Sequence, residues 1–261
     1  MNRIERKFRE LKKAKKKAFI VFITAGYPNL EITRKLILEF SRIDVDIIEL
    51  GIPFSDPMAD GLVIQESSQK ALQGKTTLDK VFRLVKNIRK FTDIPICFMS
   101  YYNPIFCYGE KRFIETASAC SVDGVIIPDL PPEEGKSFAG QSKKSGLDTI
   151  FFVSPTTTKE RMRLVFKMST GFVYYVSLTG VTGARSRLAA DMEIQVKLVK
   201  RRTQKPVCVG FGVSSPQQVK QIQSFSDGVI VGSAVIKKIK ESIARPDLVK
   251  RVSNFVASLK A

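Results

Sequence analysis

Eight short apolar runs, separated by amphipathic stretches, constrain the fold of this chain more than any other feature. Each run is rich in Val, Ile, Phe or Tyr and is continuously apolar, as strands buried on both faces are. The runs occupy residues 18–25, 45–50, 95–101, 123–129, 148–154, 172–177, 206–211 and 227–233. They predict a parallel sheet whose two faces are both covered.

Between the runs, apolar residues recur at helical spacing. Two such stripes are Ile32, Leu36, Ile37, Phe40 and Ile43, and Leu78, Val81, Phe82, Val85 and Ile88. Eight strand–helix units without a Pro/Gly/Ser-rich linker predict one α/β domain over residues 1–261, a (β/α)8 TIM barrel. We expect an N-terminal helix and an extra helix at 63–72, after the second strand. A doubly wound open sheet is the alternative, but no G-x-G-x-x-G follows the first strand.

The composition excludes several kinds of chemistry. The chain has no histidine, so a Ser-His-Asp triad, a His-ligated metal and a His general base are unavailable. The four cysteines lack C-x-x-C spacing, so we expect reduced thiols and no metal site. Acid–base chemistry must therefore come from carboxylates, Tyr, Lys or Cys.

The formal net charge is +18, and much of it lies in runs at 12–17, 200–202 and 237–240. Such an excess of basic residues is typical of proteins that bind nucleic acid or a phosphorylated substrate. No nucleic-acid motif accompanies the runs, so we interpret them as solvated helix faces and predict no nucleic-acid partner. No apolar run approaches the roughly 20 residues of a membrane helix, and no signal peptide is apparent, which predicts a cytoplasmic protein with no membrane partner.

The active site of a (β/α)8 barrel lies at the carboxyl ends of its strands. No lysine lies at any predicted strand end, so a Schiff-base mechanism lacks its nucleophile. Gly-rich turns follow the last three strands, at 179–185, 210–212 and 231–233, and the last two precede helices. Because backbone N–H groups at helix N-termini favour anions, we predict a phosphate site there; the alternative is that these glycines only make turns.

The stretch ELGIPFSDPMADG, residues 49–61, places carboxylates where the second strand ends. A buried Glu49 must be salt-bridged or neutralised by a raised pKa, and the raised pKa suits a general acid–base near neutral pH. Asp60 lies on the following loop, which can fold over the same mouth, and two carboxylates in different environments can take different roles. A core ion pair is the alternative for Glu49, and a turn cap is the favoured interpretation of Asp56.

The segment LGIPFSDPMADG resembles the signature of the tryptophan synthase alpha subunit family. Further segments resemble the family in order and cover essentially the whole chain: ITAGYP (23–28), MSYYNPI (99–105), GVIIPDLPPEE (124–134), SPTTTKERM (154–162), GFVYYVSLTGVTGAR (171–185), VGFGVSSPQQV (209–219) and DGVIVGSAV (227–235). One residue departs from the pattern, because Leu62 stands where the family has Pro, which removes a φ constraint from the Asp60 loop.

The resemblance implies a retro-aldol cleavage of indole-3-glycerol phosphate to indole and D-glyceraldehyde 3-phosphate, without a cofactor. It implies that Glu49 protonates indole C3 and helps to take the proton from the glycerol hydroxyl. It implies that Asp60 accepts or stabilises the indole N–H proton as positive charge develops on the ring. It implies that Tyr175 helps to orient the substrate and to hold Glu49 in position. A silent subunit that only activates its partner is the alternative; that subunit would have lost Glu49, Asp60 or the phosphate glycines, which are all present.

The same resemblance implies an α2β2 complex with a beta subunit, which carries pyridoxal phosphate and receives the indole. It assigns the remaining positions by function. The indole pocket has Phe22, Ser100 and Ile127; the phosphate cradle has Gly183, Gly212, Gly232 and Ser233 with Phe211 beside it; the lid, at 180–188, has Thr182; the partner-facing side has Pro53, Asp56, Pro57 and Asn103.

Overall fold

The computed structural model describes residues 2–176, 185–210 and 212–260, without the side chains of 185–190. Within these ranges the strands are all parallel. They are β1 (Ala18–Thr24), β2 (Ile47–Gly51), β3 (Ile96–Met99), β4 (Gly124–Ile126), β5 (Asp148–Ile150), β6 (Phe152–Val153), β7 (Val173–Val176), β8 (Val207–Gly210) and β9 (Gly228–Val231). All eight predicted runs contain strands, and the run at 148–154 contains both β5 and β6.

The sheet has the order β5-β4-β3-β2-β1-β9-β8-β7-β6. Its two outermost strands, β5 and β6, are separated along the chain by Phe151 alone, so the sheet returns to its own start and forms a nearly closed barrel. The prediction of a TIM barrel is confirmed. The open-sheet alternative is wrong, because an open sheet has two unrelated edges.

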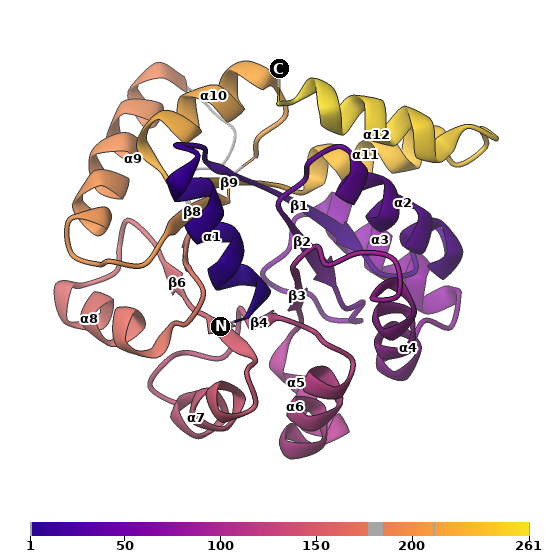
Figure 1. Cartoon of the computed structure of the whole chain (residues 1–261), viewed down its shortest axis with the longest axis horizontal. Helices are drawn as coiled ribbons and strands as arrows, with labels where there is room; N and C mark the ends of the chain where they lie inside the picture. The colour runs from indigo at the N-terminus through magenta and orange to yellow at the C-terminus, as the bar shows by residue number, and fades with distance from the viewer. Residues whose placement is uncertain (1, 177–184, 211, 261) are drawn as a thin grey trace.

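Helices surround the barrel (Figure 1). They are α1 (Arg3–Lys13), α2 (Leu30–Arg42), α3 (Leu62–Gln73), α4 (Leu78–Ile88), α5 (Tyr102–Tyr108), α6 (Glu110–Ala119), α7 (Lys136–Lys144), α8 (Lys159–Met168), α9 (Arg185–Lys200), α10 (Pro216–Phe225), α11 (Ser233–Ser242) and α12 (Leu248–Ser258). The predicted N-terminal helix is α1, and the predicted extra helix after the second strand is α3.

Polar side chains cap the N-termini of several of these helices. They accept hydrogen bonds from backbone N–H groups that would otherwise be unpaired. The Asn29 side chain accepts from Ile32 N at 2.9 Å at the start of α2. Thr77 takes the same role for α4. Ser215 and Gln218 form a reciprocal capping box at the start of α10.

Helix α1 covers the amino-terminal end of the barrel, and in Figure 1 it lies across the centre of the strands. Ile4, Phe8 and Leu11 of α1 pack into the inner core cluster, against the inward side chains of the strands. Gly124 makes room for the helix, because a Cβ there would lie 3.0 Å from Ile4 Cδ1. Helix α1 therefore closes the interior of the barrel at this end.

A buried ion-pair network holds the same end together. Asp123, just before β4, accepts from Arg89 at 2.6 Å and from Arg3 of α1 at 3.2 Å. The same carboxylate accepts from Ile96 N at 2.8 Å. Because the paired charges satisfy each other, Asp123 is buried without an unpaired oxygen.

We predict that Ile4→Ala lowers the free energy of unfolding by about 2–5 kcal/mol, because it empties a fully buried site between helix and barrel. Urea unfolding monitored by circular dichroism measures the change. Ile243→Ala is the control, since Ile243 is 47% exposed and its truncation should stay within about 0.5 kcal/mol. Equal losses in both variants would contradict the packing role of α1.

Candidate active site

Glu49 lies inside the barrel near the carboxyl end of β2. It is aligned with Phe22 of β1 on one side and Cys97 of β3 on the other. Its side chain is 1% exposed, and among the described residues its Oε2 atom has no hydrogen-bond partner. The core ion pair considered from sequence does not occur among the described residues. An unpaired carboxylate in such a place favours its neutral form.

The two carboxyls of the stretch 49–61 have different proton affinities. Burial, with a smaller contribution from the Asp60 charge, raises the pKa of Glu49 to about 8. Burial raises the pKa of Asp60 to about 6, against the lowering effect of a hydrogen bond from Tyr101. At neutral pH Glu49 is therefore mainly protonated and Asp60 mainly ionised, which makes one an acid and the other a base.

The structure places Tyr174, not Tyr175, on the inner face of β7, so the predicted tyrosine is displaced by one residue. Tyr174 belongs to the inner core cluster, and burial and then the Glu49 charge raise its pKa. Its ring faces Gly210, where an added Cβ would lie 2.4 Å from the Tyr174 hydroxyl. Tyr175 points the opposite way, as adjacent strand residues do, into the layer between barrel and helices.

Two predicted pocket residues also lie one position away from the residues that face the barrel interior. Met99 and Ile126 pack with the inner cluster, and they are aligned with each other across β3 and β4. Ser100 follows Met99 and donates to Tyr101 O at 3.0 Å, while Ile127 lies in the outer layer. Ser100 and Ile127 therefore do not face the barrel interior.

Two aromatic rings line the mouth. Phe22 lies between Gly51 and Gly232, since a Cβ at Gly51 would be 2.7 Å from Phe22 Cζ and one at Gly232 would be 3.3 Å from Phe22 Cβ. Phe152 of β6, which the sequence analysis missed, packs against Tyr174 in a tilted arrangement with ring centroids 4.8 Å apart. Counting alternate residues from each inward neighbour would have found Met99, Ile126 and Tyr174.

The two helices predicted to hold phosphate start differently. At α10, Pro216 has no N–H, and Gln218 Oε1 accepts from Ser214 N at 2.8 Å and Ser215 N at 3.2 Å. At α11 the N-cap is Gly232, which has no side chain to accept a hydrogen bond. The helix ladder begins there with Val235 N donating to Gly232 O at 2.8 Å, so the preceding amides of Ser233 and Ala234 remain available for an anion.

Gly212 lies on the same side and is exposed. Among the described residues, no atom lies within 4 Å of a Cβ added at Gly212. Three of the predicted residues, Thr182, Gly183 and Phe211, lie outside the described residues, as does most of the predicted lid.

The predicted partner-facing residues divide by exposure. Asp56 and Asn103 are exposed, whereas Pro53 and Pro57 are buried in the single chain. Asp56 accepts a hydrogen bond from the Ser55 hydroxyl, and its backbone carbonyl accepts from Met58 N at 2.9 Å, which is the turn expected from its sequence.

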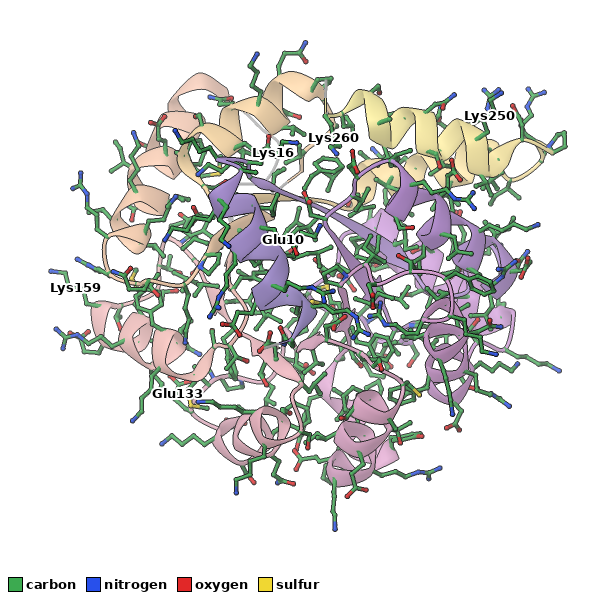
Figure 2. All side chains as sticks on the ribbon, in the orientation of Figure 1. Glu10, Lys16, Glu133, Lys159, Lys250 and Lys260 are labelled. Atoms are coloured by element: carbon green, nitrogen blue, oxygen red, sulfur yellow. The ribbon has the colours of Figure 1, made fainter. Side chains whose placement is uncertain are left out.

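The charge runs lie on the surface. Residues 12–16 are all exposed. In Figure 2, Lys159 and Lys250 lie at the outline of the molecule. Among the described residues no group of three or more His, Cys, Asp or Glu side chains could hold a metal ion. Nor does this part of the chain contain a helix long and apolar enough to span a membrane.

Comparisons with known proteins agree with one another. A family model described as "Tryptophan synthase alpha chain" matches residues 8–261. The tryptophan synthase alpha chain of Geotalea daltonii is 49% identical over all of this chain and 98% of its own length. That of Geobacter sulfurreducens is 46% identical over all of this chain and 98% of its own length.

Solved structures give the same answer. Tryptophan synthase subunit alpha from Legionella pneumophila has a TM-score of 0.94 at 37% identity, covering 100% of this chain and 97% of that one. A chain of the tryptophan synthase a2b2 complex from Pyrococcus furiosus has a TM-score of 0.86 at 38% identity, covering 93% and 97%. Fold and site define an α/β-barrel enzyme with paired carboxylates in its mouth. The chain belongs to the tryptophan synthase alpha chain family, and with it to the lyases of tryptophan biosynthesis.

We predict that Glu49→Gln stabilises the fold increasingly as pH rises. The folded chain holds the Glu49 proton up to about pH 8, whereas the unfolded chain loses it near the ordinary value of 4.5. The wild type therefore loses stability across this window, on the order of a few kcal/mol, and the amide does not. Urea unfolding at several pH values between these limits and above them measures the difference.

Glu115→Gln on the exposed surface of α6 is the matched control, and its effect should be small and similar at every pH. A Glu49→Gln effect that is also independent of pH would show that the carboxyl is ionised in the folded protein.

Proposed function

We propose that the barrel mouth cleaves indole-3-glycerol phosphate into indole and D-glyceraldehyde 3-phosphate. Membership of the family supports the reaction, and one observation supports the mechanism. The two carboxyls of the mouth are held in opposite protonation states at neutral pH, Glu49 neutral and Asp60 charged. A retro-aldol cleavage of this substrate needs an acid and a base together.

The protons balance in two steps. Glu49 gives its proton to indole C3, and the positive charge that develops on the ring nitrogen is stabilised by ionised Asp60. The glycerol hydroxyl then returns a proton to Glu49 as the carbon–carbon bond breaks. The electrons of that bond go back into the ring, which leaves as indole, and the hydroxyl carbon becomes the aldehyde. Glu49 ends protonated, so no further group must reset the site.

The inner face supplies a place for the indole ring. Phe22, Met99, Ile126 and Tyr174 surround the Glu49 position with apolar surface and aromatic rings. Such a lining excludes water, which maintains the raised pKa of Glu49. Tyr174 takes the role that the resemblance gave to Tyr175, because its ring lies on the inner face and its pKa responds to the Glu49 charge.

The phosphate group fits the start of α11. The amides of Ser233 and Ala234 begin α11 directly after the carboxyl end of β9, and the helix dipole adds to their attraction for a dianion. The α10 end contributes less, because its capping box already uses its amides. Gly212, whose Cβ position has no neighbour within 4 Å in the described part of the chain, leaves room for the phosphate oxygens.

A beta subunit is the partner that the family supports, and the solved neighbours include tryptophan synthase complexes. Two large apolar side chains stand exposed near the predicted partner-facing residues, Met58 at 84% and Phe106 at 64%. We assign them to the surface that the beta subunit covers. The α2β2 stoichiometry, pyridoxal phosphate in the partner alone, a single domain and a cytoplasmic location stay predictions.

We predict that Glu49→Gln lowers turnover of indole-3-glycerol phosphate by at least 10²–10⁴-fold, the usual contribution of a positioned acid–base group. Indole release is measured with and without a tryptophan synthase beta subunit, and Glu115→Gln is the control. Wild-type turnover in Glu49→Gln would make Glu49 structural. A wild-type chain that releases no indole but still activates the beta subunit would be the silent subunit of the alternative.

We predict that Gly212→Val raises KM for the substrate without unfolding the protein. The new Cβ meets no atom of the described residues within 4 Å, and Gly212 does not have a left-handed φ, so we expect the fold to lose little. Gly140→Val on α7 is the control, because its Cβ also meets nothing within 4 Å but lies on an outer helix. Unchanged affinity for glyceraldehyde 3-phosphate in Gly212→Val would remove this residue from the phosphate site.

A further inference from the structure

We propose that Tyr101 is a positioning residue for Asp60, which it holds over the barrel mouth through its hydroxyl group. Tyr101 follows β3 and is buried, whereas Asp60 lies on the loop after β2. The inference rests on the proposed function, because it concerns the group that stabilises the indole nitrogen. It adds a residue from a different strand to the machinery of that reaction.

The Tyr101 hydroxyl contacts the same loop at two points. It accepts a hydrogen bond from Ala59 N at 2.9 Å, and it lies close enough to the Asp60 carboxylate to lower the pKa of that group. A phenol can face a donor and a carboxylate at once, since it has one donor and accepting lone pairs. The hydrogen bond from Ala59 N fixes the peptide before Asp60, so the loop cannot turn the acid away from the mouth without breaking that bond.

Two further contacts make Tyr101 and the loop a rigid pair. The Phe54 ring lies 5.4 Å from the Tyr101 ring between centroids, which fixes the direction of the phenol. On the far side of Asp60, Gln65 Nε2 of α3 donates to Asp60 O at 2.8 Å. Asp60 is therefore held from both sides, which matters more here because Leu62 replaces a proline that would stiffen the loop.

The Tyr101 hydroxyl also affects the charge of Asp60. Burial raises the pKa of Asp60, and the neighbouring Tyr101 hydroxyl lowers it, which favours the ionised carboxylate at neutral pH. The other titratable groups that act on this cluster are Glu49 of β2 and Tyr174 of β7, with Asp129 near Tyr101. Asp129 Oδ1 accepts from Tyr102 N at 2.8 Å, so it is occupied at the start of α5.

The test is Tyr101→Phe in the full-length chain with indole-3-glycerol phosphate as substrate. The ring and its contact with Phe54 remain, and only the hydroxyl is lost. We expect kcat to fall about 10- to 100-fold, as misplacement of a reacting group does, with KM changed less than about threefold. We expect the acidic limb of the kcat–pH profile to move to higher pH, because Asp60 loses the bond that favours its ionised form.

Tyr108→Phe is the matched control, since it removes a phenol bonded to a carboxylate, Asp79, at 2.8 Å on the outer surface. Its kcat and pH profile should equal those of the wild type. In an Asp60→Asn background the Tyr101→Phe change should cost far less than in the wild type, because both residues act through one carboxylate. Urea midpoints of all variants separate loss of fold from loss of positioning.

Two outcomes overturn the inference: a Tyr101→Phe enzyme with wild-type kcat and pH profile, or full additivity with Asp60→Asn. Failure of the proposed function looks different, because the wild type itself would then release no indole. If the Tyr101→Phe chain is too unstable to assay, Gln65→Met is the second variant, because it removes the hydrogen bond from Gln65 Nε2 to Asp60 O. That variant should shift kcat without moving the acidic limb if Tyr101 alone sets the charge of Asp60.

Discussion

The closure of the parallel sheet upon itself is the constraint on which the rest of this molecule depends. Because β5 and β6 are nearly one strand, the sheet has an inside, and alternate residues of every strand must fill it. Helix α1 occupies the amino-terminal end of that interior. What remains is a mouth at the carboxyl ends, where a side chain can be buried and still face a ligand.

Burial within this closed interior is what gives Glu49 its chemistry. In water its carboxyl would be ionised at neutral pH and would be a poor acid. Inside the barrel, with Oε2 unpartnered among the described residues, the carboxyl keeps its proton. Asp60, on a loop rather than a strand, is less confined and receives a hydrogen bond, so it ionises. The barrel thus determines the protonation state of Glu49, and the loop over the mouth determines that of Asp60.

At the start of α11, on another side of the mouth, the N-cap residue determines whether an anion can bind. A glycine N-cap leaves the first amides of the helix without a side-chain acceptor, which is unfavourable for an isolated helix but suits an anion. At α10 the capping box satisfies those amides instead. Two helix starts that both follow glycines in the sequence therefore differ in their capacity for phosphate. The difference depends on Ser215, Pro216 and Gln218 at the start of α10.

The sequence by itself determined the barrel, its eight strand runs and the two carboxyls, because continuous apolar strands and an acid at a strand end are local patterns. It did not determine which side of each strand faces inward. Tyr175, Ser100 and Ile127 were each displaced by one residue from Tyr174, Met99 and Ile126. A strand apolar on both faces carries no local sign of its inner face, so only the register across the closed sheet decides it.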